Sequence, residues 1–137
     1  MLCVTRKLEF AAAHFYHNPD LSPEENRRIF GKCNNPHGHG HNYVLEVTIA
    51  GDPDPQTGMI LDLNELKELL DREVTQRMDH RHLNFEVPEL SGKIPTCEEI
   101  ARVIWRLLDP KISHGRLERV RLYESPDLFV DCTRDGR

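Results

Sequence analysis

The stretch that decides the fold is NYVLEVTIA at residues 42–50, in which apolar and polar side chains alternate. Its odd-numbered positions, from Tyr43 to Ile49, are apolar, whereas Glu46 and Thr48 lie on the opposite face of an extended chain. A period of two predicts a half-buried β-strand whose odd-numbered side chains enter the core. Gly51 opens a turn-rich segment directly afterwards, so the strand is expected to end near residue 50.

Three further segments alternate in the same way. Residues 2–10 place even-numbered apolar positions inward, and residues 119–124 and 128–132 flank the turn sequence Ser125-Pro126-Asp127. We therefore expect one pair of neighbouring strands in the first half of the chain and a hairpin near its end.

The segment between the two strand pairs has the spacing of helices. Apolar residues recur at helical intervals over residues 63–74 and 100–107, and Thr96 with Glu99 matches a capping box. A shorter helix is expected after Ser22, because proline and glutamate follow this capping serine and Gly31 supplies a stop.

The predicted fold class is α+β, with the element order ββααββ. It contains a four-stranded antiparallel sheet with two helices on one face, within a single domain over residues 1–137. So few strands leave a sheet face and two edges uncovered, and assembly of several copies into a shared barrel would cover them. We therefore expect an oligomer.

Composition excludes several classes of partner. The chain has 18 Lys and Arg against 23 Asp and Glu, a net charge of −5, so a nucleic-acid partner is not expected. Charged residues interrupt the apolar positions of MLCVTRKLEF at residues 1–10, which predicts neither a signal peptide nor a membrane span. Four scattered cysteines indicate free thiols in a reducing compartment, so we expect a cytoplasmic protein.

The sequence HGHGH at residues 37–41 leads directly into the central predicted strand. If the extended conformation continues backwards, its histidines share the inward face of Tyr43, and His14 continues the inward face of the first strand. Three imidazoles with no evident fourth protein donor are typical of a catalytic zinc site. The alternative interpretation is a pair of solvated loop histidines together with one core histidine. His80 and His82 form a second His-x-His, which permits a competing metal site.

Four other residues are candidates for proton transfer or ligand binding near that site. Cys33, next to Lys32, is a candidate base or nucleophile, with a buried structural thiol as the alternative. Asp79 and His80 offer a carboxylate and an imidazole that together relay protons near neutral pH. Glu124 faces inward on its predicted strand, where it forms a buried salt bridge or binds the edge of a guanidine-like ring such as a pterin.

These residues lie in segments that resemble the 6-pyruvoyltetrahydropterin synthase family nearly from end to end. The matching segments, in the family's order, are FAAAH at 10–14, FGKCNNPHGHGHNY at 30–43, DPQTGMILDL at 54–63, MDHRHLN at 78–84, PTCEEIA at 95–101 and LYES at 122–125.

The resemblance implies specific roles for individual residues. It implies a zinc ion, Zn2+, bound by His14, His39 and His41, since Asn42-Tyr43 follows the last of them as in the family. It also implies Cys33 as the proton-abstracting thiolate, Asp79 and His80 as its relay partners, and Glu124 as the pterin anchor. Two further residues, Thr96 and Glu98, match the lining of the pterin pocket, while Cys97 stands where threonine is more usual.

The same resemblance implies a tunnelling-fold (T-fold) subunit, assembled as a homohexamer from two trimers with active sites between subunits. The implied reaction converts 7,8-dihydroneopterin triphosphate to 6-pyruvoyltetrahydropterin with elimination of triphosphate, in tetrahydrobiopterin biosynthesis. A sister branch, 6-carboxytetrahydropterin synthase of queuosine biosynthesis, uses the same substrate. The long connection from His14 to Cys33 and the Asn-Asn-Pro after it favour the pyruvoyl branch. A non-catalytic, zinc-stabilised pterin-binding module is the alternative from another class.

Overall fold

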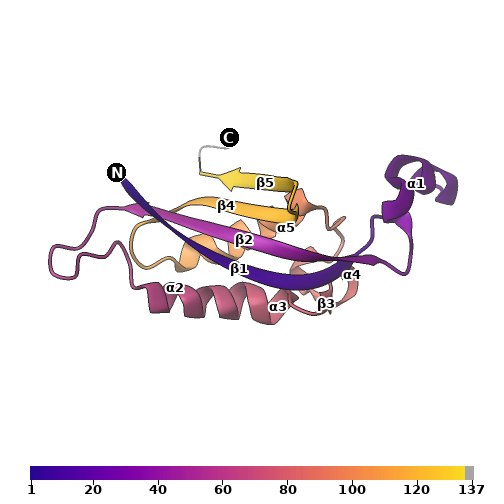
Figure 1. Ribbon diagram of the computed structural model, residues 1–137. Helices are drawn as coiled ribbons and strands as arrows, with labels where there is room; N and C mark the ends of the chain where they lie inside the picture. The colour runs from indigo at the N-terminus through magenta and orange to yellow at the C-terminus, as the bar shows by residue number, and fades with distance from the viewer. Residues whose placement is uncertain (135–137) are drawn as a thin grey trace.

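The computed structural model describes residues 1–134, and Figure 1 shows a curved sheet with helices packed against one of its faces. The strands are β1 (Leu2–His14), β2 (His39–Gly51), β3 (Arg81–His82), β4 (Arg116–Ser125) and β5 (Leu128–Thr133). The helical segments are α1 (Pro23–Phe30), η1 (Gly31–Asn34), α2 (Leu63–Leu70), η2 (Asp71–Thr75), α3 (Gln76–Met78), α4 (Leu83–Glu86), η3 (Pro88–Leu90), α5 (Cys97–Leu108) and η4 (Asp109–Lys111).

The strands form one sheet in the order β3-β1-β2-β4-β5. The predicted α+β class and the four long strands are confirmed, whereas the predicted number of strands and the fully antiparallel sheet are wrong. The fifth strand, β3, pairs parallel to β1 at Ala12 and Ala13. Two residues are too few for an alternating pattern, so sequence periodicity could not indicate this strand.

The central hairpin positions the site. β1 and β2 pair without interruption from Leu2 opposite Gly51 to His14 opposite His39. Both strands are longer than predicted, because the extended conformation runs through Ala11–Ala13 and through the His-Gly-His sequence. The connection between them leaves the sheet beyond His14 and carries α1 away from the other helices (Figure 1).

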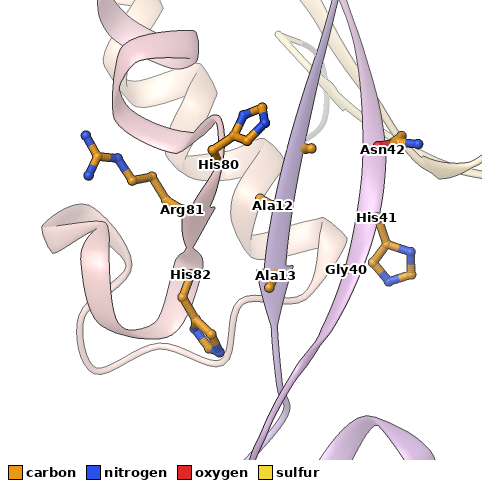
Figure 2. A pocket seen from close by; sticks show the side chains of 9 residues that line it. Ala12, Ala13, Gly40, His41, Asn42, His80, Arg81 and His82 are labelled. Atoms are coloured by element: carbon orange, nitrogen blue, oxygen red, sulfur yellow. The ribbon is translucent and has the colours of Figure 1, made fainter.

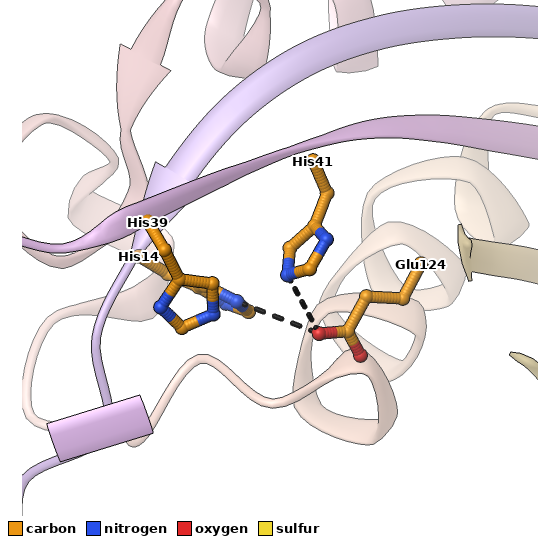
Figure 3. Close-up of side chains that lie close together, drawn as sticks. All are labelled: His14, His39, His41 and Glu124. Carbon is orange, nitrogen blue, oxygen red and sulfur yellow. Dashed lines mark ion pairs between the residues drawn. The ribbon is translucent and has the colours of Figure 1, made fainter. Parts of the chain in front are cut away.

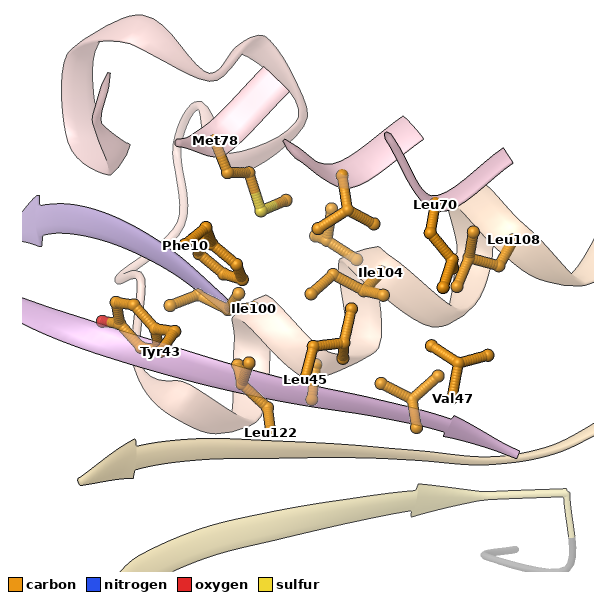
Figure 4. Packing of buried hydrophobic residues seen from close by; sticks show 14 of the residues in the cluster. Phe10, Tyr43, Leu45, Val47, Leu70, Met78, Ile100, Ile104, Leu108 and Leu122 are labelled. Atoms are coloured by element: carbon orange, nitrogen blue, oxygen red, sulfur yellow. The ribbon is translucent and has the colours of Figure 1, made fainter. Parts of the chain in front are cut away.

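The core lies between the sheet and the two longer helices, as predicted. Figure 4 shows Phe10, Tyr43 and Leu45 of the sheet meeting Ile100 and Ile104 of α5. All five side chains are almost completely buried, and the rings of Phe10 and Tyr43 stack with centroids 5.1 Å apart. Burial of large apolar side chains contributes about 1.5–3 kcal/mol each, so this layer fixes the sheet register next to the site.

The helix starts largely follow their capping sequences. Ser22 and Glu25 form the complete capping box at α1. Thr96 accepts a hydrogen bond from the Glu99 backbone, but the Glu99 carboxylate pairs with Arg102 and leaves the predicted box at α5 half formed.

The opposite face of the sheet is polar. Glu46 of β2 lies between Lys7 of β1, at 3.9 Å, and Arg119 of β4, at 3.7 Å. The outer edge of β1 from Leu2 to Ala11 pairs with no strand within residues 1–134, because β3 reaches only Ala12 and Ala13. No helix in this part of the chain combines the length and the apolar character of a membrane span.

Candidate metal and catalytic site

Three histidines meet where β1 ends and β2 begins. His14 stands directly opposite His39 in the hairpin register, and His41 lies two residues farther along β2 on the same face. Their ring centroids are 4.6 Å apart for His14 and His39, 5.1 Å for His14 and His41, and 5.0 Å for His39 and His41. The predicted convergence of these three imidazoles is therefore confirmed.

A carboxylate joins the histidines from β4. One donor atom each from His14, His39, His41 and Glu124 can be chosen so that all four lie within 4.8 Å of one another. Figure 3 shows the Glu124 carboxylate approaching the imidazoles, with Oε1 2.9 Å from His41 Nε2 and 3.6 Å from His14 Nε2. The expectation of an inward-facing Glu124 is confirmed, but the expectation that no fourth protein donor is present was incomplete.

The surroundings of His14 fix its tautomer. Its side chain is fully buried, and Nδ1 lies 2.7 Å from the carbonyl oxygen of Pro95. A carbonyl only accepts, so Nδ1 must carry the proton, and Nε2 presents its lone pair to the cluster. Burial lowers the pKa of His14 to about 4, which keeps the ring neutral at physiological pH.

The donor atoms are suited to a metal ion. His14 Nε2 and His41 Nε2 are both buried and have no hydrogen-bond partner. Burial also lowers the pKa of His41, while Glu124 acts in the opposite direction. Buried polar atoms normally have partners, and neutral imidazoles with one carboxylate are common donors to zinc and similar divalent metals. The residues therefore fit the metal that the sequence predicts.

Cys33 lies on η1 and is half-buried. Its carbonyl accepts a hydrogen bond from the Tyr16 backbone at 2.6 Å, and the Asn34 amide donates to the Tyr16 carbonyl at 2.8 Å. The Tyr16 ring in turn lies edge-on to His14, with centroids 5.1 Å apart. One backbone hydrogen bond and one from the Asn34 side chain thus hold the cysteine segment beside Tyr16, which follows β1.

Asp79 and His80 form a contacting pair at the other edge of β1. His80 Nδ1 lies 3.0 Å from Asp79 Oδ2, while Asp79 Oδ1 accepts a hydrogen bond from the Ala11 backbone at 2.9 Å. This backbone hydrogen bond is the main cause of a lowered Asp79 pKa. His80 has a left-handed backbone with φ of 61° and an exposed side chain, and it borders a pocket of about 420 Å³ shown in Figure 2.

The structure does not bring Cys33 and the Asp79–His80 pair together. Among residues 1–134, no hydrogen bond joins the Cys33 thiol to either side chain. The predicted catalytic residues therefore form two separate groups among the described residues, with no hydrogen bond between them.

Thr96 and Glu98 lie at the start of α5. The Thr96 hydroxyl accepts the capping hydrogen bond from the Glu99 backbone, and Glu98 is exposed. Between them, the buried Cys97 thiol donates to the Leu122 carbonyl at 3.3 Å, and burial raises the pKa of Cys97 to about 12. Cys97 is therefore a structural thiol.

His82 has an unexpected environment. Both ring nitrogens are buried without hydrogen-bond partners, and the ring packs against Phe85 with centroids 4.5 Å apart. The ring also lies close to the loop that precedes His39, because a Cβ atom added at Gly38 would lie 2.9 Å from His82 Nε2. The competing metal site suggested by His80 and His82 does not assemble three donors within the described residues. The contact with Gly38 left no local signal in the sequence, because it joins segments far apart in the chain.

Comparison with known proteins identifies the relatives of this chain. It is 41% identical to human 6-pyruvoyl tetrahydrobiopterin synthase over 127 residues, which cover 93% of this chain and 88% of the human protein. It is 29% identical over 150 residues to 6-carboxy-5,6,7,8-tetrahydropterin synthase from Rickettsia felis (strain ATCC VR-1525 / URRWXCal2), covering 96% and 99% of the two chains.

A solved structure shows the same fold. The 6-pyruvoyl tetrahydropterin synthase from Caenorhabditis elegans matches with a TM-score of 0.91 and 35% identity, over 96% of this chain and 94% of that chain. The family model described as 6-pyruvoyl tetrahydropterin synthase matches residues 3–135. With this match and with relatives above 40% identity, the chain belongs to the 6-pyruvoyl tetrahydropterin synthase family.

Proposed function

We propose that the protein is a zinc-dependent lyase that converts 7,8-dihydroneopterin triphosphate to 6-pyruvoyltetrahydropterin and releases triphosphate. The observation that carries this proposal is the convergence of His14, His39 and His41, two of which present buried ring nitrogens without partners. The identity of 41% to the human synthase, against 29% to the carboxy-branch enzyme, supports the pyruvoyl product.

The three histidines are the proposed zinc ligands. A bound zinc ion supplies Lewis acidity, which stabilises negative charge on side-chain oxygens of the substrate. The protein holds His14 neutral through burial and through the Pro95 carbonyl, so this ligand needs no deprotonation before a metal binds.

Substrate recognition is assigned to Glu124, Thr96 and Glu98. A carboxylate that accepts two parallel N–H bonds recognises a guanidine-like edge with defined orientation, and the pterin ring has such an edge. Glu124 borders a pocket of about 650 Å³, which is within the size range of small-molecule sites.

Proton transfer is assigned to Cys33, with Asp79 and His80 as relay partners. Asp79 already orients His80 through a contact of 3.0 Å. Cys33 has no hydrogen bond to this pair within residues 1–134, and a second copy of the chain would supply the partners that complete the set. A homohexamer built from two trimers, with active sites between subunits, supplies such a copy and covers the open edge of β1. We expect this assembly to act in the cytoplasm.

Incubation of the purified protein with 7,8-dihydroneopterin triphosphate, followed by mass spectrometry of the products, tests the proposal. We expect triphosphate and 6-pyruvoyltetrahydropterin. Release of acetaldehyde with 6-carboxytetrahydropterin would reassign the chain to the sister branch, and binding without turnover would indicate a pterin-binding module.

Single substitutions test the residue roles. Cys33→Ala should retain metal and pterin binding but lose about a hundred- to ten-thousand-fold in turnover, the usual contribution of a general base. Full activity would refute the role of Cys33. His14→Ala, His39→Ala and His41→Ala should lose zinc, whereas the matched variant His37→Ala should retain about one zinc per chain.

A further inference from the structure

The short helix that carries Cys33 has no core of its own. η1 runs from Gly31 to Asn34, contains no buried residue and begins without a side-chain cap. The preceding helix, α1, lies apart from the other helices in Figure 1, so it does not pack η1 against them. The position of η1 therefore depends on the contacts that its residues make with neighbouring segments.

These contacts converge on Tyr16, two residues after the end of β1. The Tyr16 backbone N–H donates to the Cys33 carbonyl at 2.6 Å, and the Asn34 side-chain amide donates to the Tyr16 carbonyl at 2.8 Å. Phe30, the residue before η1, packs its ring edge-on against the Tyr16 ring, with centroids 5.9 Å apart. Both backbone groups of Tyr16 are thus paired with η1, as in two antiparallel strands, but one of the two bonds comes from a side chain.

Tyr16 is itself held beside the histidine cluster. Its ring lies edge-on to that of His14, with centroids 5.1 Å apart, and 6.4 Å from that of His39. His14 is fully buried and contacts the Pro95 carbonyl, so Tyr16 follows a fixed point of the sheet. The hydrogen bond from Asn34 to the Tyr16 carbonyl therefore ties the cysteine segment to this fixed point.

We propose that Asn34 is a positioning residue for the reaction: through Tyr16, its side-chain amide holds Cys33 within reach of the substrate. This inference rests on the proposed function, which assigns proton abstraction to Cys33. A base must lie within hydrogen-bond reach of the proton that it removes, and misplacement by about 1 Å can cost about a hundredfold in rate. Without the Asn34 bond, a single hydrogen bond joins η1 to the Tyr16 backbone, and no burial within η1 compensates for the loss.

The chemistry of the bond defines the variants. A carbonyl only accepts hydrogen bonds, so Asn34 must present its Nδ2 amide to Tyr16. Asn34→Asp keeps the shape of the side chain but cannot donate to this carbonyl, whereas Asn34→Ala removes both the shape and the donor. Asn26→Ala is the matched control, because Asn26 is fully buried in the same connection and its amide donates to three carbonyls within residues 18–22. General loosening of the connection would affect this control as well.

Steady-state kinetics with 7,8-dihydroneopterin triphosphate and hydrogen exchange provide the test. We expect Asn34→Ala and Asn34→Asp to lose about 10- to 100-fold in kcat, with KM changed by less than about twofold. Both variants should retain about one zinc per chain. Asn26→Ala should keep kcat within about twofold of the wild-type value. The Tyr16 amide should exchange faster in the two Asn34 variants but not in Asn26→Ala.

A double variant separates positioning from a general structural role. If Asn34 acts only through Cys33, the variant that combines Cys33→Ala with Asn34→Ala should turn over no more slowly than Cys33→Ala alone. Multiplied losses, full activity of Asn34→Asp or an equal loss of kcat in Asn26→Ala would overturn this inference while leaving the proposed function intact. Full activity of Cys33→Ala would instead contradict the proposed role of Cys33, and with it the inference that depends on that role.

Discussion

Gly38→Ala tests how the loop that leads into His39 is held in place. Gly38 precedes His39 and has φ of 79°, a left-handed conformation that costs a residue with a side chain about 1–2 kcal/mol. Alanine recovers about 0.4–1 kcal/mol by restricting the unfolded chain, so the net backbone cost is about 1 kcal/mol.

Steric overlap adds to that cost. The new Cβ would lie 2.9 Å from His82 Nε2 and 3.3 Å from the His14 carbonyl oxygen. Overpacking of this kind costs about 1–3 kcal/mol, which brings the expected loss of stability to about 2–4 kcal/mol. Displacement of the loop should also weaken zinc binding by about 10- to 100-fold, the range found when groups that orient metal ligands are changed.

Gly92→Ala is the matched control. Gly92 has φ of 76°, but nothing lies within 4 Å of the position of its added Cβ, so only the backbone cost of about 1 kcal/mol applies. The free energy of unfolding would be measured by urea denaturation at one fixed protein concentration, with metal affinity measured by competition against a chelator. Adding His82→Ala to Gly38→Ala should recover part of the loss, because the contacting ring is removed. Equal destabilisation by Gly38→Ala and Gly92→Ala would refute the reasoning.

Three further substitutions test groups away from the metal. Glu73→Gln should destabilise the protein by about 1–3 kcal/mol at neutral pH, because the buried carboxylate accepts charged hydrogen bonds from Lys111 and Arg77. These bonds, chiefly that from Lys111, lower the Glu73 pKa, so its stabilisation is complete above the ordinary value of 4.5 and is lost as the pH falls through the lowered folded-state value. Urea denaturation at pH 7 and pH 3 should therefore show the difference between variant and wild type shrinking in acid, and a constant difference would contradict it. Asn26→Ala should expose residues 18–22 to limited proteolysis, because the buried amide holds three carbonyls of that segment, and unchanged cleavage would argue against this role. Asp79→Asn should reduce thermal stability by about 1 kcal/mol while leaving zinc content unchanged, since one acceptor on a β1 amide is weakened and no metal donor is altered. Zinc loss from this variant would contradict the assignment.

Local sequence patterns predicted the strands and helices in which apolar residues recur at regular intervals on one buried face. The alternation over residues 42–50 and the capping serine at residue 22 each involve neighbours in sequence, and both predictions were confirmed. The convergence of His14 with His39 and His41 was also predictable, because strand parity and hairpin pairing together determine which side chains share a face.

The remaining features depend on contacts between distant segments. The two-residue strand β3 exists because backbone groups near His80 meet Ala11 on β1, and no periodicity records such a short pairing. The meeting of Glu124 with the histidines depends on the register between β4 and β2, in which Tyr123 pairs with Val44, and no pattern within either strand records that register. The burial of His82 against Gly38 likewise arises only after both loops are placed.

The position of the histidine cluster makes a bound metal a crosslink. His14 and His39 are the last paired residues of β1 and β2, so they stand at the two ends of the 24-residue connection 15–38, which carries α1 and Cys33. A metal that joins the ends of a loop this long restricts the unfolded chain as a disulfide does. In the chain-entropy view this stabilises the folded protein by about 3–4 kcal/mol. Removal of the metal should therefore increase amide hydrogen exchange first within this connection, while the far end of the hairpin, near Leu2 and Gly51, retains its protection.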